Sequence, residues 1–343
     1  KNEMTFYFAY LILIVLVSLI LKKRGLFLNY SGDNHQSFSN VGNIPLSGGI
    51  FLIFPIIYLY SNDLILVTFL STIFLLGFFS DRKILVSPQK RFLFQVISIL
   101  LFVIIADLKI LTSRIELFDI MLSNQVFAYL FSTFCLLILI NGSNFIDGLN
   151  GLLISYSLIV IYTLGNLELI TDQIISNQNF YLILWLMLLV LFLNIFNILM
   201  IGDGGAYLLG FLLGFVIITS HENNPNISPY FYISIIWYPC FENLFSILRK
   251  LNKKFSPLNP DNKHLHQLVF FFVKEKINLS TILSNNLSSA ILIFFNFSII
   301  YISSLNPSST MYQVKLILCS IIFYITCYFM LNKFYKLNFK FKK

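Results

Sequence analysis

Charged residues are scarce in this chain of 343 residues: they make up 11% of it, whereas hydrophobic residues make up 57%. Soluble globular domains carry about 25% charged residues. The mean hydropathy of +0.82 agrees with this contrast. The composition therefore excludes an ordinary soluble protein and predicts an all-α polytopic membrane protein, built as a single integral membrane domain over residues 1–343.

Cysteine is also rare, with four residues in the chain. Cys135, Cys240, Cys319 and Cys327 all lie in apolar runs, and none belongs to a C-x-x-C pair. We interpret them as small core residues, which argues against a disulfide framework or a cysteine-based zinc site.

Long apolar runs recur along the whole sequence and predict ten or eleven transmembrane helices. The second, fourth, sixth and eighth runs are short for a full crossing. The first run lacks a small-residue cleavage site and is followed by Lys-Lys-Arg, so we interpret it as a retained helix. The runs are 4–21, 46–60, 64–80, 92–106, 126–141, 150–164, 180–200, 206–220, 230–247, 281–304 and 313–331.

Basic residues predict the orientation, because Lys and Arg gather in short cytoplasmic loops. An amino terminus outside places nearly all of the 23 basic residues inside. The exceptions are Lys1, Lys109, Arg114 and Lys315. Since the net charge of +8 borders membrane helices, we expect it to meet lipid headgroups and phosphorylated substrates, not nucleic acid.

The inward loops of this topology hold most of the residues with chemical potential, so one cytoplasmic site could be built from them. These loops are 22–49, 81–91, 142–151, 201–206 and 248–280. The most informative segment is NGSNFIDGLNGL, Asn141 to Leu152, between two apolar runs. A charge near the bilayer centre costs roughly 2.5–3.5 kcal/mol, so Asp147 is a candidate functional residue.

Two other inward segments carry acidic residues at the end of an apolar run. GFFSDRKILVSPQKRFLFQ holds Asp81, and places Arg91 and Gln95 one helical turn apart. In MIGDGGAYLLG, Asp203 lies between glycines, where its carboxylate could face a divalent ion and the backbone a phosphate. The plainer alternatives are that Asp81 solvates a helix end and Asp203 belongs to a turn.

The remaining two inward loops are rich in turn and basic residues. In VGNIPLSGGI, Gly48 could allow close approach of the backbone to a ligand, although a structural turn explains it equally well. RKLNKKFSPLNPDNKHLHQ brings Lys263, His264 and His266 close together after a proline-rich turn. No cysteine pair accompanies these histidines, so a phosphate-handling surface is favoured over zinc.

Together these motifs resemble, in the same order, the polyprenyl-phosphate N-acetylhexosamine-1-phosphate transferase family, integral membrane enzymes of the glycosyltransferase 4 type. The resemblance covers roughly residues 40–270. It rests on PLSGG, GFFSD followed by Ser87, Arg91 and Gln95, NGSNFIDGLNGL, GDGGAYLLG and SPLNPDNKHLHQ.

The resemblance implies transfer of an N-acetylhexosamine-1-phosphate from a UDP-sugar to undecaprenyl phosphate, with release of UMP. This would be the first membrane step of a surface glycan such as O-antigen or capsule. The expected setting is the plasma (inner) membrane, with the site facing the cytoplasm. The oligomeric state stays open, a homodimer being one option.

The resemblance also implies roles for individual residues. It places Mg²⁺, or Mn²⁺, on Asp203. It makes Asp81, Asp147, His264 and His266 catalytic. Substrate binding would fall to Asn144, Arg91, Lys263, Asn150 and Gly48.

The chain departs from the family pattern at several positions. Ser80 replaces an aspartate often assigned to deprotonating the lipid phosphate, Asn150 replaces a second aspartate, and Gln267 replaces a histidine. Asn43 stands where a basic residue is usual. A phosphate monoester is already mostly dianionic at neutral pH, so Ser80 challenges the general-base role more than the activity. Two alternatives therefore remain: a lipid-linked sugar transporter or flippase, and a catalytically weakened relative acting as a binding scaffold.

Overall fold

The computed structural model describes residues 2–28, 44–171, 174–254, 256 and 263–339, and these residues confirm the predicted all-α fold. Asn43 lies outside the described residues, as do parts of the predicted loops 22–49 and 248–280. The helices of the described part are α1 (Asn2–Lys23), α2 (Gly48–Leu59), α3 (Leu64–Asp81), α4 (Pro88–Ile105), α5 (Glu116–Leu122), α6 (Gln125–Ile146), α7 (Leu152–Asn166), α8 (Asn177–Ile195), α9 (Gly202–Asn223), α10 (Pro229–Ile235), α11 (Trp237–Asn252), α12 (Leu265–Ile277), α13 (Thr281–Ser304) and α14 (Thr310–Phe339).

Six of these helices are long and apolar enough to cross a membrane, and a bent pair of helices would make a seventh span. The six are α3, α4, α6, α9, α13 and most of α14. Helices α2 and α7, and the segment Asn179–Ile195 of α8, are apolar but shorter. The protein is therefore a multi-pass membrane protein, while ten or eleven crossings and the sidedness stay predictions.

The predicted continuous helix over 230–247 is wrong. Two helices, α10 and α11, replace it and meet at 77° around Ile236. Pro239 lies in the first turn of α11. Its ring would clash with the carbonyl group four residues earlier, that of Ile235, if the helix were continuous. The break therefore falls where α10 ends.

Three segments predicted as inward loops are largely helical, and in one of them, 248–280, α12 and the end of α11 take up more than half of the residues. Helix α6 continues to Ile146, so the polar stretch after Asn141 forms its last turns instead of a loop. Helix α9 begins at Gly202, so Asp203 lies in its first turn. Both polar motifs are thus held on rigid elements, which fixes their side chains better than a loop would.

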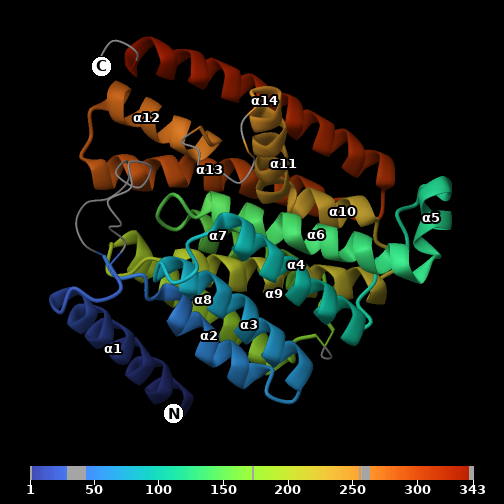
Figure 1. The fold of residues 1–343 in the computed structure, drawn as a ribbon, viewed down its shortest axis with the longest axis horizontal. Coiled ribbons are helices and arrows are strands. Elements are labelled where there is room, and N and C mark those ends of the chain that lie inside the picture. Colours follow the sequence, from blue (N-terminus) through green and yellow to red (C-terminus); the bar gives the residue numbers. More distant parts are fainter. Residues whose placement is uncertain (1, 29–43, 172–173, 255, 257–262, 340–343) are drawn as a thin grey trace.

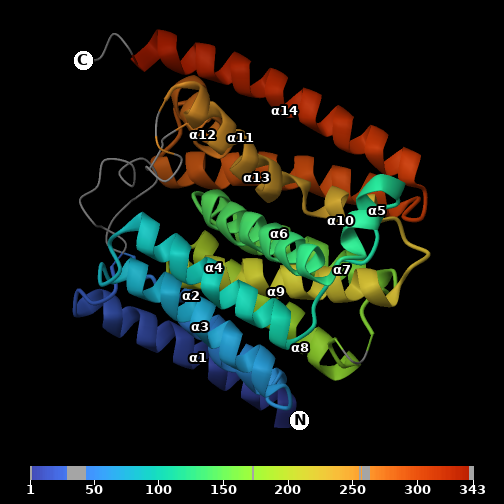
Figure 2. The same cartoon turned by 45° about the vertical axis from the view of Figure 1, so that its right-hand side comes forward.

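Helix α9 lies at the centre of the bundle, with α1 and α14 at opposite edges in both views (Figures 1 and 2). It packs against α2, α3 and α6. The contacts are close because glycines face one another: a Cβ on Gly49 would overlap the backbone of Gly205. A Cβ on Gly77 would likewise overlap the backbone of Asp203. Glycine at these positions lets the polar ends of α2, α3 and α9 meet.

Helices α11 to α14 lie on the side of α6 that faces away from α9 (Figure 2). Helix α11 packs on α6, and α12 packs on both α13 and α14 (Figure 2). This arrangement brings the start of α12 close to the end of α6. The predicted histidines and the predicted Asp147 therefore lie at the same end of the bundle.

Candidate functional site

The end of α3 and the starts of α4 and α9 form a cluster of Ser80, Asp81, Arg91 and Asp203, here called the carboxylate–arginine cluster. Asp81 is the last residue of α3. Its Oδ1 accepts a hydrogen bond from the backbone N of Asp203 at 3.0 Å, and its Oδ2 accepts one from the backbone N of Gly204 at 3.2 Å. Asp81 thus caps the start of α9, where N–H groups lack helical partners and favour negative charge.

Arg91, Ser80 and Asp203 form a triangle of polar contacts in this cluster. The Ser80 hydroxyl donates to Asp203 Oδ2 at 2.6 Å and accepts from the Arg91 guanidinium. Arg91 also forms an ion pair with Asp203 Oδ2 at 3.3 Å. The side chains of Arg91 and Asp203 are 25% and 29% exposed, so a phosphate could reach both from solvent.

The position of Arg91 follows from the sequence at the start of α4. Ser87 is the N-cap of this helix, and its Oγ accepts from the backbone N of Lys90. Pro88 occupies the first turn, where its missing N–H costs nothing. Arg91 and Gln95 then lie one turn apart on the same face. Gln95 accepts a hydrogen bond from the Asn141 side chain at 3.3 Å, which links α4 to the polar end of α6.

Gly48 lies at the start of α2 and pairs with the segment before α9. Its backbone N donates to the carbonyl of Met200 at 2.8 Å, and the backbone N of Gly49 donates to that of Ile201 at 3.1 Å. The return bond runs from the N of Met200 to the carbonyl of Pro45 at 2.9 Å. The PLSGG motif therefore positions the start of α9, and a direct contact of Gly48 with substrate stays a prediction.

Asp147 lies directly after α6 and faces the other acidic residues of the site. Burial raises its pKa well above the ordinary carboxyl value, and the carboxylates of Asp203 and Asp81 raise it further. Its charged form is therefore unfavourable unless a cation or a proton compensates it. Asn144 is half-buried on the last turn of α6, and its side chain makes no hydrogen bond to another described residue.

The start of α12 forms a second cluster of Glu242, His264, His266 and Tyr324, here called the histidine–glutamate cluster. His264 Nδ1 lies 2.9 Å from Glu242 Oε1, and the Tyr324 hydroxyl donates to Glu242 Oε2 at 2.7 Å. The rings of His264 and His266 stack with their centroids 5.7 Å apart. Burial and the neighbouring His264 lower the pKa of His266 to about 3, so this ring is neutral at physiological pH.

The turn at the end of α6 lies against both clusters. The ring of Phe145 is 4.9 Å from the ring of His264. A Cβ on Gly148 would overlap Nε2 of His266. Asp147, between these two residues, interacts electrostatically with Asp203 and Asp81. The structure therefore brings the predicted Asp81, Asp147, Arg91, Asp203 and histidines to one place.

The side chain of Asn150 contacts residues outside the two clusters. Its amide nitrogen donates to Asn197 Oδ1 at 3.0 Å and to Asn286 Oδ1 at 3.1 Å, which uses both of its hydrogens. Its backbone N donates to Asn285 Oδ1 at 2.8 Å. Asn150 thus ties the start of α7 to α8 and α13, and its predicted contact with the nucleotide stays untested.

Lys263 precedes α12 and is half-buried. Its carbonyl accepts from the Arg249 guanidinium at 2.8 Å, and Arg249 also donates to the hydroxyl of Tyr328 at 3.0 Å. Arg249 therefore holds the segment that enters α12. The predicted role of the Lys263 ammonium in phosphate binding stays a prediction.

The carboxylate–arginine cluster fits a magnesium ion that a substrate helps to hold. Among the described residues, no group of three or more His, Cys, Asp or Glu side chains could by itself hold a metal. Mg²⁺, however, is commonly bound by one or two carboxylates together with substrate phosphates and water. Asp203 Oδ1 accepts no hydrogen bond from a described residue, so this oxygen could serve as a ligand.

Two residues of the site escaped the sequence reasoning. Glu242 is buried, at 1% exposure, within the apolar run 230–247. A carboxylate in such a run is a functional candidate by the argument that singled out Asp147, so the signal was present. Tyr324 gave no signal, because one tyrosine in an apolar helix is ordinary and only the fold brings it to Glu242.

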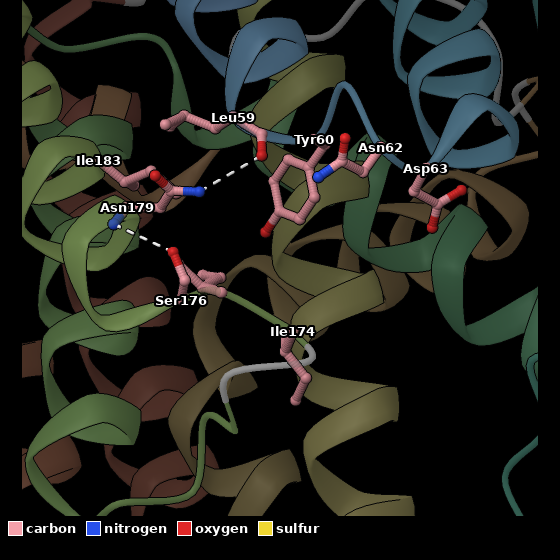
Figure 3. Close-up of a pocket in the computed structure, with 9 residues that line it drawn as sticks. Leu59, Tyr60, Asn62, Asp63, Ile174, Ser176, Asn179 and Ile183 are labelled. Carbon is pink, nitrogen blue, oxygen red and sulfur yellow. Dashed lines mark hydrogen bonds between the residues drawn. The ribbon is translucent and has the colours of Figure 1, made fainter.

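A cavity of about 300 Å³ lies elsewhere, at the turn between α2 and α3 (Figure 3). Its lining includes Tyr60, Asp63, Ser176 and Asn179. Asn179 closes one side by donating to the carbonyl of Leu59 at 3.4 Å. Because α3 runs from this turn to Asp81, the cavity is roughly 27 Å from the carboxylate–arginine cluster. It is not part of the candidate site.

Comparison with known proteins agrees with the motifs. Residues 64–221, just under half of the chain, match the family model described as glycosyl transferase family 4. The segment includes the carboxylate–arginine cluster and the end of α6, whereas Glu242, the two histidines and Tyr324 lie beyond it. This match confirms the family resemblance predicted from the sequence.

Individual relatives carry the same description, undecaprenyl-phosphate alpha-N-acetylglucosaminyl 1-phosphate transferase. The Yersinia pestis protein is 29% identical over 153 residues, which are 42% of this chain and 41% of the relative. The Escherichia coli K12 protein is 27% identical over 150 residues, with the same shares. The Salmonella typhi protein is 25% identical over 236 residues, or 67% of this chain and 64% of the relative. The chain thus matches two fifths to two thirds of the length of these relatives.

Proposed function

We propose, starting from the match of residues 64–221 to glycosyl transferase family 4, that this protein transfers an N-acetylhexosamine-1-phosphate from a UDP-sugar to undecaprenyl phosphate. An oxygen of the lipid phosphate attacks the β-phosphorus of the UDP-sugar. A new P–O bond forms there, and the bond from the β-phosphorus to the oxygen bridging the two phosphates breaks. UMP leaves with that oxygen and its electron pair, and undecaprenyl-diphosphate sugar remains.

The observation that carries this proposal is the meeting of Asp203, Asp81, Arg91 and Asp147 from four separate helix ends. Phosphoryl transfer asks little covalent chemistry of a protein, because catalysis comes from positioning and from neutralising charge. Arg91, with a quarter of its side-chain surface exposed, offers a planar guanidinium that suits a phosphate. The stacked His264 and His266 border the same turn and offer further ring nitrogens.

These contacts support proposed roles for individual residues in the reaction. Asp81 fixes the first turn of α9 and so holds Asp203 in place. Arg91 exchanges its ion pair with Asp203 for a bond to the diphosphate when substrate binds. Asn144, Lys263 and Gly48 are proposed to contact the UDP-sugar, and His264 to stabilise the charge that develops on departing UMP.

We propose that a divalent cation, Mg²⁺ or Mn²⁺, takes part through Asp203. When bound, such an ion polarises the phosphoryl oxygens and neutralises their charge. Asp147 supports this assignment, because its pKa is raised by burial and by Asp203 and Asp81. A buried carboxyl group with two further carboxylates nearby favours a cation beside it.

The donor sugar and the pathway are proposed from chemistry and from the relatives. The relatives' shared description names an N-acetylglucosaminyl 1-phosphate transfer, so UDP-N-acetylglucosamine or a close UDP-N-acetylhexosamine is the first donor to try. The product would start a surface glycan such as O-antigen or capsule. We place the site on the cytoplasmic face of the plasma membrane, because most of the basic residues fall in the predicted inward loops, which also carry the residues of the site.

The departures at Ser80, Asn150 and Gln267 fit an active enzyme better than a weakened scaffold. Ser80 connects Arg91 to Asp203. Gln267 Oε1 accepts from the backbone N of His264 at 3.1 Å and thereby fixes the start of α12. Asn150 joins α7 to α8 and α13. Each of the three replacing side chains thus forms hydrogen bonds of its own, so none of the three replacements leaves an empty position in the site.

The test uses the purified full chain with Mg²⁺, undecaprenyl phosphate and a panel of UDP-sugars. We expect UMP release and a lipid product whose mass equals undecaprenyl phosphate plus one N-acetylhexosamine phosphate. Movement of a preformed lipid-linked sugar across proteoliposomes, without any UMP release, would favour the transporter alternative. Release of neither product would favour the scaffold.

A further inference from the structure

Glu242 is a buried carboxylate for which the proposed function has no task so far. It lies on α11 and is 1% exposed. Oε1 accepts from His264 Nδ1 at 2.9 Å and from the backbone N of Leu265 at 3.4 Å, and Oε2 accepts from the Tyr324 hydroxyl at 2.7 Å. A buried carboxylate with three donors is well satisfied, which is the condition for tolerating such a group.

These contacts decide which ring nitrogen of His264 carries the proton. An ionised carboxylate only accepts hydrogen bonds, so His264 must donate through Nδ1. In the neutral ring Nε2 is then an acceptor, and in the protonated ring it is a second donor. Either way Nδ1 is committed to Glu242, and Nε2 is the nitrogen left for a ligand.

The ring of His264 is also held in orientation by its neighbours. Its centroid is 4.9 Å from the ring of Phe145 and 5.7 Å from the ring of His266, which is tilted by 11°. The ammonium of Lys250 lies 5.9 Å from the centroid of the Phe145 ring. Phe145 is two residues from Asp147. The ring of His264 therefore packs against the same turn that carries the proposed substrate pocket.

We propose that Glu242 is the positioning residue for His264, and that Tyr324 of α14 in turn positions Glu242. The inference rests on the proposed transferase function. The inference gives α14 a part in the site, although α14 is remote in sequence from residues 64–221, the region of the family match. Carboxylates that orient a histidine serve the same purpose in other enzymes, where they fix tautomer and direction.

The test compares four variants of the full chain in UMP release with UDP-sugar and undecaprenyl phosphate. Glu242→Leu removes the acceptor, and Glu242→Gln keeps an amide oxygen that can accept from Nδ1. Tyr324→Phe removes one donor to the carboxylate. Tyr156→Phe is the matched control, because it deletes a buried hydroxyl bonded to the carbonyl of Ile235 at 2.8 Å, with no part in the cluster.

We expect kcat to fall about 10- to 100-fold in Glu242→Leu, the range for losing a hydrogen bond to a charged group. The fall should be about 3- to 10-fold in Glu242→Gln and smaller in Tyr324→Phe. KM for the UDP-sugar should change little, because an interaction made with the leaving group counts mostly in the transition state. Tyr156→Phe should keep the kcat of the unaltered protein.

A readout independent of activity is the ring ¹⁵N spectrum of the four histidines, with His264 assigned by its replacement. We expect His264 Nδ1 to be protonated in the unaltered chain and in Glu242→Gln. In Glu242→Leu the ring should lose this fixed tautomer. A role in folding alone would lower the thermal midpoint without changing the tautomer preference.

Unchanged kcat and an unchanged His264 spectrum in Glu242→Leu would overturn the inference while leaving the transferase intact. If Glu242→Leu does not fold, Glu242→Gln decides: kcat equal to that of Tyr156→Phe would overturn the inference as well. Absence of UMP release from the unaltered chain would contradict the proposed function instead, so the two failures are distinguishable.

Discussion

The two clusters of this site differ in how firmly their charges are held. In the carboxylate–arginine cluster, Arg91 and Asp203 keep about a quarter of their side-chain surface exposed, at 25% and 29%. In the histidine–glutamate cluster, His264 and Glu242 keep 7% and 1%. The first can exchange partners with an incoming phosphate at little cost, whereas the second has its partners fixed by packing from α6, α11, α12 and α14.

This difference assigns the two clusters different tasks. Ion pairs near solvent contribute about 0–1 kcal/mol to stability, so the Arg91–Asp203 pair is easily given up for a ligand. Breaking a buried pair by removing one partner costs roughly 3–5 kcal/mol. The carboxylate–arginine cluster is therefore suited to binding and chemistry, and the histidine–glutamate cluster is suited to fixing the orientation of the histidine rings. Variants in the first should affect turnover, and variants in the second should also affect folding.

The largest effect is expected for Asp203→Asn. The amide keeps the shape but loses the charge that would hold a divalent cation, so UMP release should fall about 100- to 1000-fold, as when one transition-state contact is lost. Asp63→Asn is the matched control, because Asp63 caps the opposite end of α3 and asparagine caps as well. Full activity in Asp203→Asn, measured over a range of Mg²⁺ concentrations, would contradict the metal assignment.

The next effect is expected for Arg91→Lys. Lysine retains the charge but not the planar pair of donors, so it cannot contact Ser80, Asp203 and a phosphate in the same geometry. We expect kcat/KM for the UDP-sugar to fall about 10- to 100-fold with little change in the thermal midpoint. An equal loss of midpoint and activity would mean that Arg91 serves the fold and not the substrate.

A smaller effect is expected for Ser80→Ala. The hydroxyl connects Arg91 to Asp203, and its loss removes one charge-assisted bond on each side. Activity should fall about 10-fold, a loss of about 1.4 kcal/mol in transition-state stabilisation, because the two partners keep their direct ion pair. Higher activity in Ser80→Asp than in the unaltered protein would instead support the weakened-relative alternative.

The smallest effect concerns the stability of the fold at acidic pH and involves the histidine–glutamate cluster. Burial lowers the pKa of His266 to about 3 from an ordinary 6.5. The unfolded chain therefore takes up a proton near pH 6.5 while the folded chain does not, so this histidine destabilises the fold as pH falls. Between pH 6.5 and 5 the loss is at most about 2 kcal/mol.

His266→Gln should remove this contribution, because glutamine does not titrate. Thermal midpoints in detergent at pH 7.5 and pH 5 measure it. Glu242 and His264 also face this ring, and both are present in the two proteins compared. An unchanged acid sensitivity in His266→Gln would show that His266 is not held neutral by burial.

The carboxylate–arginine cluster was predicted better from the sequence than the histidine–glutamate cluster. Asp81, Asp203, Arg91 and Asp147 stand at the ends of apolar runs, where a charge is conspicuous and the spacing is local. Glu242 lay inside an apolar run and was overlooked, although its charge was equally costly there. Tyr324 could not have been found, because its role depends on packing of α14 against a helix far away in sequence.

Element boundaries show the same division between local and tertiary causes. The apolar runs located nearly all the helices, because hydrophobicity is a local property. The break at Ile236 was missed although Pro239 was a local signal of it. The role of Asn150 could not be predicted, since its partners Asn197 and Asn286 are brought close only by the fold.

The central claim is that the acidic groups and Arg91 at the ends of α3, α4, α6 and α9 carry out phosphosugar transfer. Its most direct test is the mass of the lipid product formed from UDP-N-acetylglucosamine and undecaprenyl phosphate in the presence of Mg²⁺. The account predicts undecaprenyl-diphosphate N-acetylhexosamine, with one UMP released for each molecule formed and about 100- to 1000-fold slower product formation by Asp203→Asn. Unaltered undecaprenyl phosphate with every UDP-sugar of the panel would contradict it.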